Sequence, residues 1–230
     1  ALLTAAFSQP VYLGNDANVA ALAETALGAA RGYRDVIFIT VSTGIGGGVI
    51  TDGRMLLGKD GMGAEVGHMV MLVDDRVSTL EKEAAGPALA RQAKTRLELG
   101  EPSIIRDAVN GNLNLITGRT VGEAAVLGDP LALSIVQRAG RILGLGITTL
   151  LHIFNPEIIV LGGGVANGLG ELLFAPMREA MQASAIDRTY WETLQILTAA
   201  LGDNVSIYGA AALVLTRGGI QDVTEAVTGG

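Results

Sequence analysis

The chain has 230 residues, of which 49% are hydrophobic and 17% charged, and it contains no cysteine. This composition is typical of a compact α/β protein, and it excludes disorder as well as any disulfide, thiolate zinc or iron–sulfur site built from this chain. A formal charge of −7 and only 4% aromatic residues argue against a nucleic-acid partner, which needs basic and stacking surfaces.

The absence of cysteine fits a reducing compartment, so a cytoplasmic location is expected. The longest apolar stretch, Ile142 to Phe154, is interrupted by Gly144, Gly146 and His152 and falls short of the roughly 20 residues needed to span a bilayer. We therefore expect a buried helix there and no membrane partner. The first ten residues lack a starting Met and a cationic signal-peptide start, which predicts a fragment or a trimmed chain.

The first quarter of the chain predicts a strand, a helix and a three-strand meander. Residues 11–13 predict a short strand, and Asn15-Asp16 opens an Ala-rich run to Ala30 that predicts a capped helix. Val36–Val41 is nearly all apolar and β-branched, as expected of a central strand buried on both faces. After the glycines, two apolar runs flank Asp52-Gly53, a strong signal for a two-residue hairpin.

The remaining elements alternate between helices and short strands. A Gly-rich loop is expected over residues 58–67 and a strand over residues 68–73. Helices are predicted from Thr79 to about Leu99, from Pro102, from Thr120 with the capping-box spacing to Glu123, and from Asp129-Pro130 to Phe154. A buried strand over residues 158–161, a helix from about 170 to 183, a strand over 194–198 and a helix over 206–216 follow. This order predicts a mixed α/β fold with one main sheet.

Two glycine clusters are candidates for binding phosphates or a nucleoside. Residues 43–48 are followed by a strand, which excludes a dinucleotide fingerprint or Walker loop, because both deliver phosphate to a helix N-terminus. An anion-binding nest with the Thr43 hydroxyl as an extra donor remains, and a plain glycine turn explains the same residues. Residues 162–164, between a strand and a helix, permit close approach of a flat ligand, and a plain loop explains them equally well.

Polar residues in three other segments have a structural explanation when each is taken alone. Asn15-Asp16 has the composition of a helix cap. Glu65 and His68 fit a surface loop, and Glu81 fits an acid that the helix dipole stabilises in a first turn.

Five motifs in a fixed order are more specific than any one of them. From about Pro10 to about Leu215 the chain resembles the ROK family of repressors and sugar kinases, and most closely its bacterial glucokinases. The motifs are Leu-Gly-Asn-Asp-Ala-Asn (13–18), Thr-Gly-Ile-Gly-Gly-Gly (43–48), Gly-Ala-Glu-Val-Gly-His (63–68), Leu-Glu-Lys-Glu-Ala-Ala-Gly (80–86) and Asn-Pro-Glu-Ile-Ile-Val-Leu-Gly-Gly-Gly-Val (155–165).

The resemblance implies an actin-like ATPase (ribonuclease H-like) fold, with a mixed sheet flanked by helices. It implies that residues 1–14 end a small N-terminal domain and that residues 15–204 form the large sugar kinase domain. Residues 205–230 would form a C-terminal helix and tail that pack back toward the small domain. A homodimer is the expected assembly. The implied substrates are a hexose, with glucose as the first candidate, and ATP with Mg²⁺.

The resemblance also implies a role for each candidate residue. Asp16 would be the base that accepts the sugar hydroxyl proton, which suits a carboxylate that is ionised at neutral pH. The sugar would be bound by Asn15, Glu65, His68 and Glu81. The nucleotide would be bound by Thr43, Gly44 and Gly46 at its phosphates and by Gly162, Gly163 and Gly164 along its adenosine.

Two family features are missing. The first phosphate motif, Asp-x-Gly-Gly-Thr, is absent, so this polypeptide is expected to be inactive by itself. The cysteine cluster that binds zinc between the matches to His68 and Glu81 is also absent, and residues 69–79 look shortened. We therefore expect that the protein binds no zinc and that His68 holds no metal. Other contacts must then hold the loop that orients Glu81.

The favoured hypothesis is an ATP-dependent hexose kinase of the glucokinase type. The alternative is the sugar-sensing domain of a ROK transcriptional repressor, with a helix-turn-helix upstream. Asp16 and the glycine turn favour the kinase, because a sensor needs neither to bind sugar. A catalytically dead paralogue is the third reading, favoured by the missing cysteines.

Overall fold

The computed structural model describes residues 2–228; residue 1 and residues 229–230, which belong to the two predicted terminal segments, lie outside that range. Its centre is a five-stranded sheet with the order β3-β2-β1-β6-β7. The strands are β1 (Val36–Val41), β2 (Ile45–Thr51), β3 (Arg54–Met55), β6 (Ile158–Gly162) and β7 (Gln195–Thr198). Because β1 pairs antiparallel with β2 and parallel with β6, the strand predicted to be central is central in a mixed sheet.

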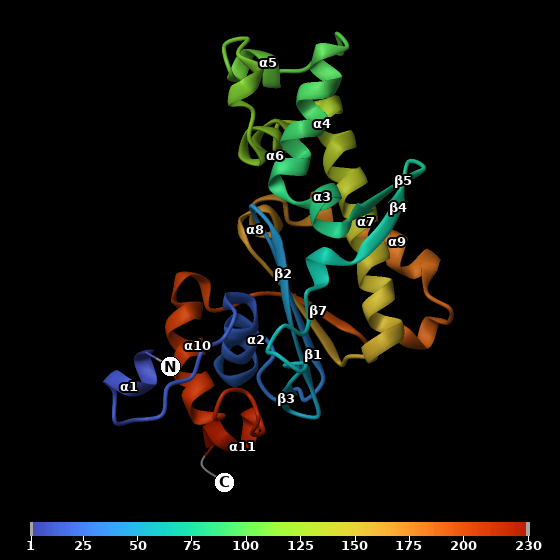
Figure 1. Cartoon of the computed structure of the whole chain (residues 1–230). Coiled ribbons are helices and arrows are strands. Elements are labelled where there is room, and N and C mark those ends of the chain that lie inside the picture. The colour runs from blue at the N-terminus through green and yellow to red at the C-terminus, as the bar shows by residue number, and fades with distance from the viewer. Residues whose placement is uncertain (1, 229–230) are drawn as a thin grey trace.

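Helices cover both faces of this sheet (Figure 1). One face carries α2 (Asp16–Leu27), α10 (Val205–Leu215) and α11 (Val223–Thr228), and the other carries α7 (Pro130–Phe154) and α9 (Glu171–Ser184). Alternate residues of β1 and β6 enter two separate cores, because successive side chains of a strand point to opposite faces. The predicted mixed sheet flanked by helices is therefore confirmed.

More helices lie beyond the carboxyl ends of β1 and β6 (Figure 1). They are α3 (Leu80–Ala84), α4 (Gly86–Glu98), α5 (Ile105–Ala108), α6 (Gly118–Val126) and α8 (Gly164–Leu169). A separate hairpin of β4 (Val70–Val73) and β5 (Arg76–Thr79) leads into α3. The short helix α1 (Leu2–Ala6) begins the described part of the chain.

The longest helix, α7, follows the sequence prediction at both ends. Asp129 accepts a hydrogen bond from the Ala132 backbone N–H (2.9 Å), and Pro130 occupies the first turn. The helix ends at Asn155, which adopts a left-handed conformation with φ of 45°. Its apolar stretch packs one face against the core, and residues 2–228 contain no helix long and apolar enough to cross a membrane.

Several local predictions were wrong. Residues 11–13 form no strand. The helix predicted from Thr79 to about Leu99 is interrupted at Ala85, whose ψ of 166° is extended. The capping box lies one turn earlier than predicted, between Thr117 and Thr120, because Thr117 has the extended backbone that a cap requires. The strand predicted from His68 begins at Val70, because a 3₁₀ turn, η1 (Val66–His68), precedes it.

Candidate functional site

Three consecutive glycines, Gly46 to Gly48, let the helix α2 and the turn η1 approach opposite faces of β2. A Cβ on Gly46 would lie 3.1 Å from the Ala17 Cβ, and one on Gly48 would lie 2.6 Å from the Ala21 Cβ, so α2 rests directly on the strand. Gly47 points to the opposite face, where an added Cβ would lie 2.5 Å from a Val66 methyl group. The glycine run therefore has a packing role that brings the start of α2 and η1 to one strand.

The Asn15-Asp16 pair forms the start of α2. The Oδ1 atoms of Asn15 and Asp16 both accept from the Ala17 backbone N–H, at 2.9 and 2.8 Å. Both residues are exposed, and Asp16 Oδ2 has no hydrogen-bond partner within residues 2–228. The predicted cap is confirmed, and a free carboxylate oxygen remains beside it.

The other predicted sugar ligands lie around Ile45, the first residue of β2. Glu81 Oε2 accepts from the Ile45 backbone N–H at 2.9 Å, and a Cβ on Gly44 would lie 2.6 Å from the same oxygen. A Cβ on Gly67 would lie 1.9 Å from the Ile45 carbonyl oxygen, so η1 also rests on this residue. Glu65 and His68 flank Gly67 and are exposed. The structure thus brings the start of α2, η1 and Glu81, which hold or flank the candidate residues, to one end of β2, from both of its faces.

The two glycine clusters meet at the carboxyl edge of the sheet. Thr40 of β1 lies opposite Gly162 of β6 in parallel register, so the turns that follow both strands are neighbours. Gly163 has a φ of 92°, and a Cβ there would lie 2.5 Å from the Val41 carbonyl oxygen. Ligands of open α/β sheets bind at this edge.

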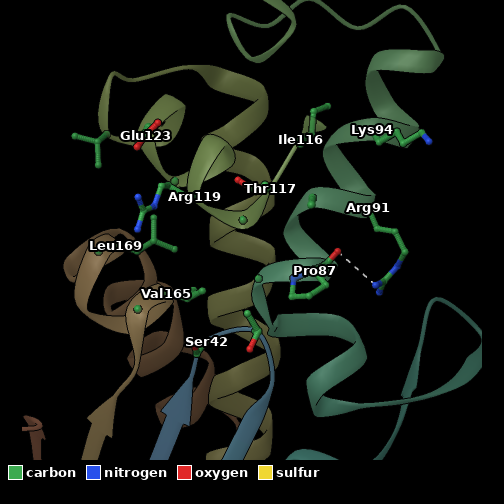
Figure 2. A pocket seen from close by; sticks show the side chains of 18 of the residues that line it. Ser42, Pro87, Arg91, Lys94, Ile116, Thr117, Arg119, Glu123, Val165 and Leu169 are labelled. Atoms are coloured by element: carbon green, nitrogen blue, oxygen red, sulfur yellow. Dashed lines mark hydrogen bonds between the residues drawn. The ribbon is translucent and has the colours of Figure 1, made fainter. Parts of the chain in front are cut away.

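A cavity of about 1120 Å³ opens beside these turns (Figure 2). Its floor forms where α4 and α6 begin: the Gly86 N–H donates to the Ser42 carbonyl at 2.8 Å, and a Cβ on Gly118 would lie 2.7 Å from the Gly86 Cα. Of the predicted nucleotide ligands, Thr43 and Gly164 line the cavity, whereas Gly44, Gly46, Gly162 and Gly163 do not.

The cavity walls combine apolar surface with a few basic groups. Figure 2 shows Val165 and Leu169 on one side, and Arg91 and Lys94 on α4 across from them. Lys94 Nζ donates to Asn114 Oδ1 at 2.7 Å. Such a lining fits a ligand with a flat apolar part and an anionic part. The α4 and α6 walls were not predicted from the sequence, although the glycines at the starts of both helices signal their close approach.

The segment between His68 and α3 does not fit the zinc site of the family that the chain resembles. It forms the β4–β5 hairpin and contains no thiol, whereas structural zinc is held mainly by cysteine and histidine. Within residues 2–228 no three His, Asp or Glu side chains lie close enough to hold a metal ion. The absence of zinc from the protein stays a prediction.

Comparisons with known proteins agree on one family. The model of the ROK family matches residues 1–217. The glucokinase of Thermotoga maritima is 34% identical over 213 residues, which cover 90% of this chain and 66% of that protein. This chain therefore spans about two thirds of the length of that relative.

Solved structures with the same fold include an enzyme and a regulator. The crystal structure of a ROK family glucokinase from Streptomyces griseus, in complex with glucose and AMPPNP, is 34% identical, with a TM-score of 0.79 over 92% of this chain and 70% of that chain. A ROK family transcriptional regulator, a homologue of the E. coli MLC protein, is 28% identical, with a TM-score of 0.80 over 99% of this chain and 57% of that chain.

Proposed function

The chain belongs to the ROK family, and on that premise we propose that it is the larger part of an ATP-dependent hexose kinase of the glucokinase type. Its fold is the actin-like ATPase fold of the ROK sugar kinases. The observation that carries the proposal is the position of two elements at the first residues of β2. The start of α2, which holds Asp16, packs on Gly46, and Glu81 accepts from the Ile45 N–H, close in sequence to Thr43, which lines the cavity together with Gly164.

A hexose would bind at the end of β2 that begins with Ile45. Its hydroxyl groups need several donors and acceptors that approach from different directions. Asn15 and Asp16 offer these groups from one face of the strand, and Glu65, His68 and Glu81 offer them from the other. Glucose is the first candidate, because the similar enzymes are glucokinases.

ATP would place its adenosine in the cavity and its phosphates toward the Thr43–Gly44 turn. The apolar side chains of Val165 and Leu169 suit a nucleobase, and Gly164 leaves open space, with no atom within 4 Å of an added Cβ. The described residues supply no three-ligand metal group, so we expect Mg²⁺ to arrive on the nucleotide phosphates, as it does in many kinases.

Asp16 would act as the base. As the sugar oxygen attacks the γ-phosphorus, its proton passes to the carboxylate, the bond to the β-phosphate oxygen breaks, and ADP leaves. The free Oδ2 of Asp16 suits this role, because Oδ1 already accepts from the Ala17 N–H. Positioning and electrostatic stabilisation supply the rest of the rate.

A sugar-sensing repressor domain is the alternative, since the MLC homologue shares the fold over 99% of this chain. The exposed Asp16 carboxylate and the nucleotide-sized cavity favour the kinase, because sugar sensing requires neither feature. A cytoplasmic location, a homodimer and the division into domains stay predictions.

Incubation of the natural full-length protein with ATP and a panel of hexoses tests the proposal. We expect a hexose phosphate and ADP in equal amounts, with glucose among the best substrates. Hexose binding without transfer, combined with sugar-dependent binding to DNA, would instead identify a repressor.

A further inference from the structure

The β4–β5 hairpin ends in a tight turn that faces α7. Val73 pairs with Arg76, and the two residues between them, Asp74 and Asp75, have φ values of 50° and 58°. Positive φ at both central residues is the geometry of a type I′ turn, which suits the twist of a two-stranded hairpin. The hairpin continues through Thr79, whose side chain accepts a hydrogen bond from the Lys82 N–H and so caps α3.

A buried carboxylate, Glu83 of α3, joins the hairpin to α7. Glu83 is only 2% exposed. Its Oε1 accepts from Ser78 Oγ at 2.7 Å and lies 2.8 Å from Arg76 Nη2, and its Oε2 accepts from Arg138 Nη2 at 3.0 Å. Arg138 also contacts Asp74 Oδ2 at 2.6 Å. We call Glu83, Arg76, Arg138 and Asp74 the ionic cluster.

The ionic cluster keeps Glu83 charged in spite of its burial. Burial raises the pKa of Glu83, but hydrogen bonds from Ser78 and Arg138 and the charge of Arg76 outweigh it, so the pKa lies below its ordinary value. The negative charges of Glu83 and Asp74 balance the positive charges of Arg76 and Arg138. Glu83 is the buried member, whereas the side chains of Arg76 and Asp74 are exposed. Removal of an arginine partner would therefore leave the buried Glu83 charge less compensated.

The same helix carries Glu81, which points to the sheet. α3 has five residues, too few to be a stable helix by itself, so its orientation depends on the contacts at its two sides. On one side, Glu81 bonds the Ile45 N–H. On the other, Glu83 is tied to the hairpin and α7, and the fully buried Leu80 packs where Gly146 leaves room.

We propose that Glu83 is a positioning residue for hexose binding: the ionic cluster fixes α3 so that the Glu81 carboxylate meets the sugar. The inference rests on the proposed function. It assigns to charged residues of this chain the task that a thiolate metal site cannot perform here, because the hairpin has no cysteine.

Substitution of Glu83→Gln in the natural full-length protein tests this role. The amide keeps the shape of the side chain and removes its charge. We expect the hexose KM and the calorimetric hexose Kd to rise about tenfold, because Glu81 loses part of a charge-assisted hydrogen bond to the sugar. The kcat and the KM for ATP should stay within about twofold, since ground state and transition state lose the same contact.

The matched control is Asp222→Asn. Asp222 is also buried, at 4% exposure, and is paired with an arginine, with its Oδ2 2.8 Å from Arg34 Nη1, but it lies beside α11. We expect this variant to lose stability without a change in hexose KM. If Glu83→Gln fails to fold, Ser78→Ala, which removes only one hydrogen bond to Glu83, should raise the hexose Kd about twofold to fourfold.

The outcomes separate the two proposals. A folded Glu83→Gln protein with unchanged hexose affinity overturns the positioning role, and so does an equal rise in hexose KM for Asp222→Asn. If the wild-type protein binds hexose but transfers no phosphate, the kinase proposal fails, and the hexose Kd of the variants still decides whether Glu83 positions Glu81.

Discussion

Two parts of the candidate site are fixed by different physical means. The start of α2 lies on β2 through close packing at Gly46 and Gly48. α3 is fixed through charges, with Glu83 between Arg76 and Arg138. Packing of this kind tolerates no added atom and does not depend on pH, whereas a buried charge is sensitive to protonation and to a substitution that removes the charge while keeping the shape.

The largest expected effect concerns Asp16. Asparagine caps a helix about as well as aspartate, so Asp16→Asn should change stability by only a few tenths of a kcal/mol. Loss of the base should lower kcat by roughly 10² to 10⁴, with hexose affinity little changed. Steady-state kinetics and urea unfolding of the full-length protein measure both effects. A variant that keeps most of its turnover would reduce Asp16 to a helix cap.

Substitution of Gly48→Ala tests the close packing of α2 on β2. The added methyl group would lie 2.6 Å from the Ala21 Cβ and 3.0 Å from the Ala17 carbonyl oxygen, so α2 must shift. We expect a loss of about 1 to 3 kcal/mol in the free energy of unfolding. Gly168→Ala is the control, because nothing lies within 4 Å of its added Cβ. Equal stability of the two variants would show that α2 does not depend on close contact.

Substitution of Glu81→Gln tests the proposed sugar contact of α3, the helix that is fixed through charges. The amide oxygen can still accept from the Ile45 N–H, but the charge that would bind a sugar hydroxyl is lost. Hexose binding measured by calorimetry should weaken by about 1 to 3 kcal/mol. Unchanged affinity for every hexose tried would leave Glu81 as an acid at a helix start.

The stability that the ionic cluster around Glu83 contributes should also depend on pH. The pKa of Glu83 is lowered in the folded protein, so its contribution to stability is present above the unfolded pKa of about 4.3 and is lost as the pH falls through the folded value. Urea unfolding should therefore show a stability difference between wild type and Glu83→Gln at pH 7 that narrows below about pH 4. A difference independent of pH would mean that Glu83 is not charged in the folded state.

No effect is expected from metal removal. The hairpin that supports α3 relies on the ionic cluster, so a chelator should leave the melting temperature unchanged. Differential scanning calorimetry with and without chelator measures this, and elemental analysis is the control. Stoichiometric zinc would contradict the prediction.

Elements fixed by local chemistry were predictable. The cap at Asn15, the β-branched run of β1, the Asp52-Gly53 turn and the Asp129-Pro130 start of α7 each carry their own signal in a few adjacent residues. The fold class followed from their order, and the family resemblance added the expected actin-like topology.

Features that depend on distant contacts were not predictable from the sequence. Gly86, which follows the break at Ala85, lies against Gly118, which is far from it in the chain, and both residues line the cavity. The role of Glu83 could not be predicted, because its partners Arg76 and Arg138 lie on a hairpin and a helix that only the fold brings together.

The most direct measurement is a crystal structure of the natural full-length protein with glucose and a non-hydrolysable ATP analogue. We predict one sugar with hydroxyl groups within hydrogen-bond distance, about 3 Å, of both the Asp16 and Glu81 carboxylates. The adenine should occupy the cavity beside Thr43 and Gly164. A sugar that contacts only one of the two carboxylates, or a nucleotide bound outside the cavity, would contradict the convergence on which the proposed kinase site rests.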